Sequence, residues 1–160
     1  MKIEYVHASR YGNGVMVAEE FRDQMAPRSV EVDVHSIHDV GPDRLPQADL
    51  YLFSSPGRYG NCTRQMRRFL RKVELPAGTR YAILTTELPP RPDKKTGKMP
   101  TDREIARWQH VSRDMNEVLV GKGLVEVTED KVFVTGLKGP LEEGWRDKVR
   151  AFAERIPIEH

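Results

Sequence analysis

Hydrophobic residues recur along the chain at two alternating spacings, and these spacings predict strands followed by helices. Extended apolar segments cover residues 2–8, 29–35, 49–54, 80–86 and 124–127. A spacing of three and four, typical of one buried helix face, follows in residues 15–25, 66–73, 101–120 and 142–156. Residues 36–48 break this alternation, because Pro42 and Pro46 leave room for little more than one helical turn.

The second and third predicted strands differ in pattern, and the difference indicates the order of the sheet. Residues 30–34 alternate valine with acidic residues, as in an edge strand, whereas residues 50–53 are all apolar, as in a strand covered on both faces. The pattern predicts an α/β fold: a doubly wound, five-stranded parallel sheet in a three-layer α/β/α sandwich. Right-handed crossovers restrict the strand order, and the edge-like second strand and core-like third strand favour 2-1-3-4-5 over 3-2-1-4-5. We expect one domain over residues 1–157 and a tail at 158–160.

Two segments fit the alternation less well. Residues 87–100 match no regular element and hold four prolines and three lysines, Pro89, Pro90, Pro92, Pro100, Lys94, Lys95 and Lys98. A capping box at Thr101 and Glu104 opens the next helix. Its buried side is predicted to hold Ile105, Trp108, Met115, Val118 and Leu119. Residues 128–131 are predicted to turn, after which residues 132–134 either extend the fifth strand or pair back on it.

Composition narrows the classes of protein that the chain can belong to. Of 160 residues, 38% are hydrophobic and 31% charged, which is enough to fill a core and excludes global disorder. A formal net charge of +2 is small for a nucleic-acid-binding protein, and no apolar run reaches transmembrane length. Cys62 is the single cysteine, so an internal disulfide and a multi-cysteine metal site are excluded. We expect a cytoplasmic protein.

The turn between the first strand and the first helix is a candidate anion site. It consists of Ser9, Arg10, Tyr11, Gly12, Asn13 and Gly14. The first amides of a helix lack internal partners and carry partial positive charge, and glycine lets the backbone close around a phosphate. The alternative, a plain turn in which Gly and Asn merely tolerate positive φ, stays open at this point.

A second loop shares the crevice with this turn in the predicted strand order. It follows the third strand and consists of Ser55, Pro56, Gly57, Arg58, Tyr59, Gly60 and Asn61. Ligands of doubly wound sheets bind at the carboxyl ends of the strands where the order reverses, here between strands one and three. The two loops therefore suit a ligand with a phosphate at one end and a flat ring at the other.

With these residues in place, the chain resembles the flavodoxin-like family over nearly its whole length. Residues 37–51 are similar to the family's crossover into the third strand. Residues 55–61, continuing through 65–70, look closest to the flavin-dependent NAD(P)H:quinone reductases related to the tryptophan-repressor-binding protein. The first loop of those proteins also carries a Ser-x-Tyr-Gly pattern, matched here by Ser9, Tyr11 and Gly12.

The resemblance implies a flavin mononucleotide (FMN) cofactor. By analogy, residues 9–14 hold the phosphate and residues 55–61 line the isoalloxazine ring. The third flavin loop of the family corresponds to Thr85, Thr86 and Glu87. The expected partners are a nicotinamide, a quinone or a redox protein; nucleic acid is not expected, and a homo-oligomer stays open.

Several single residues carry their own interpretation. Tyr59 is a candidate for stacking on the ring, with a plain surface tyrosine as the alternative. Arg58 is a candidate for contact with the flavin or an acceptor, with a solvated side chain as the alternative. Cys62 is read as a small residue at a helix start, because it lacks a partner cysteine. His110 is expected to lie mid-helix without special function. Trp108 and Trp145 are expected in the core. Lys94, Lys95 and Lys98 are expected in a solvated loop, with closure over an anionic group as the alternative.

Three functions remain in competition at the level of sequence. The first is a flavin protein that passes electrons as a carrier or small oxidoreductase. The second is an enzyme that takes hydride from a nicotinamide and reduces a quinone. The third is a flavodoxin-like interaction module without cofactor, since one fold hosts many functions.

Overall fold

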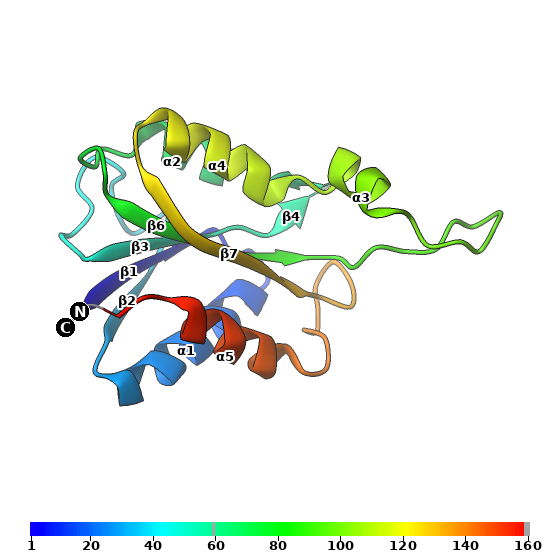
Figure 1. Ribbon diagram of the computed structural model, residues 1–160, viewed down its shortest axis with the longest axis horizontal. Helices are drawn as coiled ribbons and strands as arrows, with labels where there is room; N and C mark the ends of the chain where they lie inside the picture. The colour runs from blue at the N-terminus through cyan, green and yellow to red at the C-terminus, as the bar shows by residue number, and fades with distance from the viewer. Residues whose placement is uncertain (59, 159–160) are drawn as a thin grey trace.

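A five-stranded parallel sheet forms the centre of the computed structural model, which describes residues 1–58 and 60–158 (Figure 1). The strands are β1 (Lys2–His7), β2 (Glu31–Ser36), β3 (Leu50–Ser54), β6 (Arg80–Glu87) and β7 (Val125–Phe133). Their spatial order is β2-β1-β3-β6-β7, all parallel. The predicted order is therefore confirmed, with β6 and β7 as the fourth and fifth strands.

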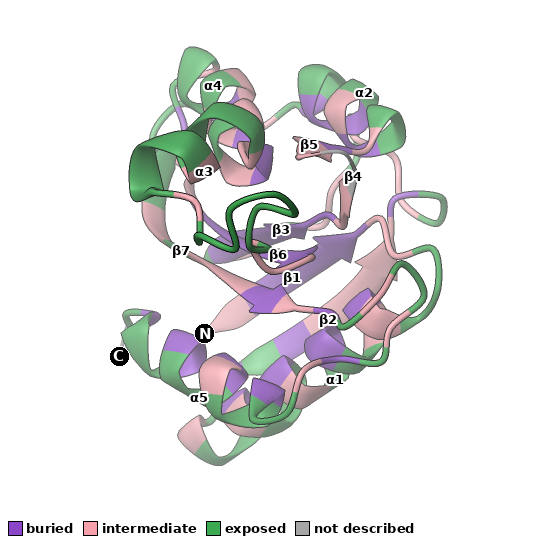
Figure 2. Cartoon of the chain, turned by 90° about the vertical axis from the view of Figure 1, so that its right-hand side faces the viewer, coloured by how far each residue is buried: buried purple, intermediate pink, exposed green. Residues whose placement is uncertain are grey.

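Helices cover both faces of the sheet, which confirms the predicted three layers (Figures 1 and 2). One layer holds α1 (Asn13–Met25), the short η1 (Ala26–Arg28) and α5 (Trp145–Arg155). The other holds α2 (Arg64–Lys72), α4 (Val111–Gly121) and, beside it, α3 (Asp102–Trp108). The crossover of residues 37–49 contains no helix, in keeping with its prolines.

Alternating side chains of the central strands fill two cores. On β3, Leu50 and Leu52 face the α1–α5 layer, whereas Tyr51 and Phe53 face the α2–α4 layer. All four are buried, as the unbroken apolar run predicts for a strand covered on both faces. At the β2 edge, Val30 and Val32 are buried while Glu31 is exposed.

The structure corrects the sequence interpretation in two places. Residues 128–131 do not turn, because β7 runs unbroken from Val125 to Phe133 with its backbone paired to β6. The helix expected over residues 101–120 is two helices, α3 and α4, separated at Gln109 and His110. Trp108, predicted to be buried, is consequently 49% exposed.

Among the described residues, no helix is long and apolar enough to cross a membrane. Ile158 packs against the core, and the remaining two residues of the predicted tail, 159 and 160, lie outside the described residues.

Candidate functional site

The turn after β1 presents unpaired backbone amides. Gly12 is the N-cap residue of α1 and has a φ of 88°, a conformation that glycine adopts without strain. In the described part of the chain, the amides of Tyr11, Gly12 and Asn13 donate to no acceptor. The first intrahelical bond runs from Met16 N to Gly12 O, at 3.0 Å. These open N–H groups can donate hydrogen bonds to an anion.

Ser9 fixes the shape of this turn from both sides. Its hydroxyl oxygen accepts a hydrogen bond from Gly14 N at 3.2 Å, and its own amide donates to His7 Nδ1 at 3.1 Å. Gly14 is required because a Cβ there would lie 2.9 Å from Ser9 Cβ. The hydrogen bond from Ser9 N requires His7 Nδ1 to be unprotonated, because it is the acceptor. Burial also favours the neutral imidazole, because it lowers the pKa of His7.

Charges around the turn favour a negative ligand. The first turn of α1 contains no acidic side chain, so the positive end of the helix dipole is not neutralised. Two cations, Arg10 and Lys138, lie 5.6 and 5.9 Å from the ring centroid of Tyr11. Tyr11 itself is 46% exposed. A phosphate at this turn would meet open amides with cations nearby.

The loop between β7 and α5 also reaches this turn, and the sequence analysis missed it. Gly139 lies so close to Asn13 that a Cβ on it would sit 2.6 Å from Asn13 Oδ1. The loop is closed at its base by Thr135, whose amide and hydroxyl both donate to Pro140 O at 2.8 Å. The two glycines and the proline of residues 136–140 indicate a loop in the sequence, but they do not indicate that this loop packs against the turn after β1.

The second predicted loop starts as an extension of the sheet. Ser55 is buried, and its carbonyl accepts from Thr86 N at 3.2 Å. Pro56 bridges to Thr86 in parallel pairing. The Ser55 hydroxyl donates to Pro56 O at 3.0 Å and accepts from Thr63 N at 3.3 Å. This segment is therefore held by β6 and by the start of α2.

The rest of that loop forms a small hairpin of β4 (Gly57–Arg58) and β5 (Asn61–Cys62). Gly60 lies at the tip of the hairpin with a φ of 80°. It packs against the junction of α3 and α4. Gly60 O accepts from His110 N at 2.8 Å, and a Cβ on Gly60 would lie 1.4 Å from Trp108 O. Tyr59, the predicted stacking residue, lies outside the described residues, as does the side chain of Arg58.

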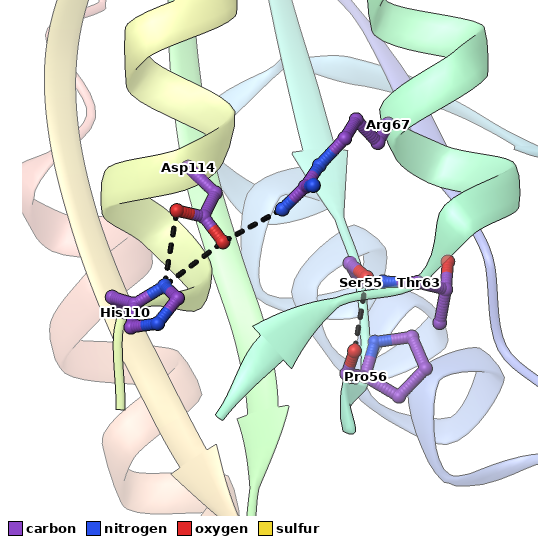
Figure 3. A network of polar contacts seen from close by, with 6 residues as sticks. All are labelled: Ser55, Pro56, Thr63, Arg67, His110 and Asp114. Atoms are coloured by element: carbon purple, nitrogen blue, oxygen red, sulfur yellow. Dashed lines mark hydrogen bonds and ion pairs between the residues drawn. The ribbon is translucent and has the colours of Figure 1, made fainter. Parts of the chain in front are cut away.

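Behind the hairpin, side chains from α2 and α4 converge on Asp114 (Figure 3). Arg67 Nη2 lies 2.9 Å from Asp114 Oδ2, and His110 Nδ1 lies 2.9 Å from the same oxygen. Cys62 is buried beside Arg67, and burial raises the pKa of its thiol. A buried thiol with a raised pKa is unreactive, which fits the interpretation of Cys62 as a packing residue.

His110 does not lie mid-helix, as the sequence predicted. It is the N-cap residue of α4, at the break between α3 and α4. Its backbone holds Gly60 and its ring holds Asp114, so it positions the hairpin. Trp145 is buried in the core, as predicted.

The third predicted group is part of the sheet and not of a loop. Thr85, Thr86 and Glu87 are the last three residues of β6, buried and paired with residues 131–133 of β7. The Thr85 hydroxyl donates to Glu87 Oε2, and Lys131 Nζ lies 4.0 Å from that oxygen. The chain leaves the sheet after Glu87, so these three residues belong to β6 and the loop begins at residue 88.

A hollow of about 540 Å³ lies at the opposite end of the sheet and is not a candidate site. Lys122 is among its lining residues, and Lys122 Nζ donates to the carbonyls of Arg71 and Val73 at 2.7 and 3.0 Å. Those bonds satisfy the last carbonyls of α2, which is a structural role.

Comparison with known proteins identifies the fold. No protein-family model and no curated protein sequence matches the chain. Among solved structures, flavodoxin 2 from Bacillus cereus matches with a TM-score of 0.71 and 18% identity over 97% of each chain. A flavodoxin from the domain Archaea matches with a TM-score of 0.67 and 18% identity over 96% of this chain and 94% of that one. The chain has a flavodoxin-like fold.

In a flavodoxin-like fold with this strand order, the switch point lies between β1 and β3. The two predicted loops follow these neighbouring strands, in which His7 and Ser54 are paired in register. The structure thus brings residues 9–14, 55–58 and 60–61 to the same edge of the sheet. It adds the 135–140 loop beside the first of them and the α3–α4 junction behind the second.

Proposed function

We propose that the chain binds FMN at the carboxyl ends of β1 and β3 and transfers electrons through it. The open amides of Tyr11, Gly12 and Asn13 carry the proposal, because a phosphate dianion suits their geometry and the positive helix end. The similarity to flavodoxins supports it through the fold.

Each predicted binding residue keeps a defined part in this proposal. The open amides of Tyr11, Gly12 and Asn13 and the hydroxyl of Ser9 hold the phosphate. Arg10 adds a positive charge beside it, and Gly14 leaves room for the Ser9 side chain. Residues 55–61 line the ring, and Thr85, Thr86 and Glu87 support this lining from within β6. Bound flavin supplies the redox chemistry, while the chain provides position and field.

A matched pair of variants tests the phosphate site. Asn13→Asp places a negative charge in the first turn of α1 without changing side-chain size, which favours the helix but repels a phosphate. Gln65→Glu makes the equivalent change in the first turn of α2, at an exposed position. Fluorescence titration of FMN should show affinity falling about tenfold or more in Asn13→Asp and remaining unchanged in Gln65→Glu.

Riboflavin, which lacks the phosphate, is the second arm of the same titration. We expect wild type to bind it more weakly than FMN and Asn13→Asp to leave its affinity unchanged. A wild-type protein that does not quench FMN fluorescence would refute flavin binding and favour an interaction module.

The finer function is the one suggested by the NAD(P)H:quinone reductase branch. We propose that the chain acts as an NAD(P)H:quinone reductase. The purified, flavin-loaded protein should then oxidise a nicotinamide when a quinone is present. Absence of that turnover in a loaded protein favours an electron carrier that serves a redox partner. The cytoplasmic location remains a prediction.

A further inference from the structure

The segment between β6 and α3, residues 88–100, extends from the carboxyl end of the sheet as an arm (Figures 1 and 2). We call residues 88–100 the basic arm. Residues 91–99 of the basic arm are all exposed. Its base is anchored, because the side-chain amide of Gln109 donates to Leu88 O at 2.8 Å. The arm therefore starts at a fixed point beside the hairpin and reaches into solvent.

The tip of the basic arm is an ordered turn built around Asp93. Asp93 Oδ1 accepts from the amides of Lys95 and Thr96 at 2.7 and 3.0 Å, and these bonds lower the pKa of that carboxyl. The backbone of Asp93 also bonds to Gly97 N and Lys98 O, both at 2.8 Å. A preformed turn loses less conformational freedom on binding than a flexible loop.

Positive charge dominates this turn. Residues 91–98 contain four cations, Arg91, Lys94, Lys95 and Lys98, against the single acid Asp93, a net charge of +3. Within the described residues none of the four cations forms an ion pair. Their charge is therefore available to an approaching surface, and single-sign patches steer such encounters.

Exposed apolar side chains gather at the same end of the molecule. Tyr11 follows β1, Met99 and Trp108 follow β6, and Leu137 follows β7, with exposures of 46%, 58%, 49% and 79%. Aromatic residues and Met beside cations are typical of protein–protein interfaces, in which they form the anchors.

We propose that the basic arm and these four apolar residues dock the acidic surface of a protein partner that exchanges electrons with the chain. The identity of the partner as a redox protein rests on the proposed function, because the flavin would lie at this edge of the sheet. The acidic character of the partner rests on the arm alone. Protein is favoured over nucleic acid because the apolar anchors come from three separated segments and the net charge of the chain is only +2.

Binding to cytochrome b5, an acidic haem protein, tests the surface without requiring bound flavin. In titrations of the ¹⁵N-labelled protein at low ionic strength, we expect resonance shifts confined to residues 88–108 and the neighbouring carboxyl-edge loops. The variant Lys94→Gln/Lys95→Gln/Lys98→Gln should bind about tenfold more weakly. Added salt should weaken wild-type binding and have little effect on the variant.

The matched control removes three exposed cations from the opposite end of the molecule. Arg22→Gln/Arg71→Gln/Lys72→Gln changes the last turns of α1 and α2 and should keep wild-type affinity. Shifts on another face, equal losses in both triple variants, or no binding at all would overturn the proposal. So would tighter binding of a single-stranded oligonucleotide to the arm at physiological salt. A protein that binds cytochrome b5 through the arm but does not bind FMN would refute flavin binding and leave the basic docking surface for an acidic partner intact.

Discussion

The two loops at the switch point are built in opposite ways. The turn after β1 leaves three amides open and is shaped by one local hydroxyl, that of Ser9. The hairpin after β3 has its groups engaged by distant segments: Thr86 bonds to Ser55, and His110 bonds to Gly60. The open turn is suited to receive a ligand, whereas the geometry of the hairpin is set by packing.

This difference predicts that changes in the open turn act mainly on ligand binding, whereas changes in the hairpin act mainly on folding stability. A change in the open turn should alter what the protein binds and cost little folding free energy. A change in the hairpin should cost folding free energy first, because it disturbs contacts between β6, α3 and α4.

The largest expected effect comes from placing a methyl group on each loop's positive-φ glycine. Gly60→Ala combines an unfavourable φ of 80° with a Cβ that would lie 1.4 Å from Trp108 O. We expect a loss of roughly 3 kcal/mol or more in the free energy of unfolding, measured by urea denaturation. Gly12→Ala, with a φ of 88° and no atom within 4 Å of the added Cβ, should lose only about 1–2 kcal/mol.

Gly78→Ala calibrates this pair, because Gly78 has the same φ as Gly12 and equally open surroundings, yet lies far from either loop. If Gly60→Ala lowers the free energy of unfolding no more than Gly78→Ala does, then Gly60 does not pack closely against the Trp108 carbonyl.

A smaller effect is expected from removing one hydroxyl at the start of each helix. Ser9→Ala removes the acceptor for Gly14 N, and Thr63→Ala removes the acceptor for Met66 N at the N-cap of α2. Each should cost about 1 kcal/mol of stability. FMN titration should separate them: the affinity of Ser9→Ala should fall, and that of Thr63→Ala should not. Equal affinities in the two variants would mean that Ser9 does not shape the binding turn.

The smallest effect concerns pH. Burial lowers the pKa of His7 below its ordinary value of 6.5, with Asp39 opposing and His35 adding to the shift, so the unfolded chain binds the proton more readily. Stability should therefore fall as the pH drops below that value, and Ser9 N should lose its acceptor. His7→Asn keeps an acceptor but cannot titrate. Between about pH 7.5 and 5.5 we expect wild type to lose more stability than His7→Asn, with Glu4 contributing equally to both.

The sequence was sufficient for the strand order and for β1, β2, β3 and β6, because the hydrophobic pattern of each agrees with its place in the sheet. The apolar run of residues 50–53 is typical of a strand covered on both faces, and the alternating valines at 30, 32 and 34 are typical of a strand with one buried face. The open turn was also predictable, since its conformation depends on Ser9 and Gly12 themselves.

The errors arose where distant contacts override local pattern. Thr128 to Lys131 are polar because β7 is an edge strand, and their strand character comes from pairing with β6. Trp108 fits a helical stripe only if the helix continues through Gln109, and the break there turns it outward. Position 60 requires glycine because the Trp108 carbonyl lies against it. The residues around Gly60 in the sequence do not predict this contact.

The contact between Gly139 and Asn13 joins the beginning of the chain to a segment near its end. The surroundings of the first turn are therefore complete only when residues 135–140 have folded against it. If the chain binds FMN as proposed, phosphate binding should appear later in refolding than the burial of the central strands.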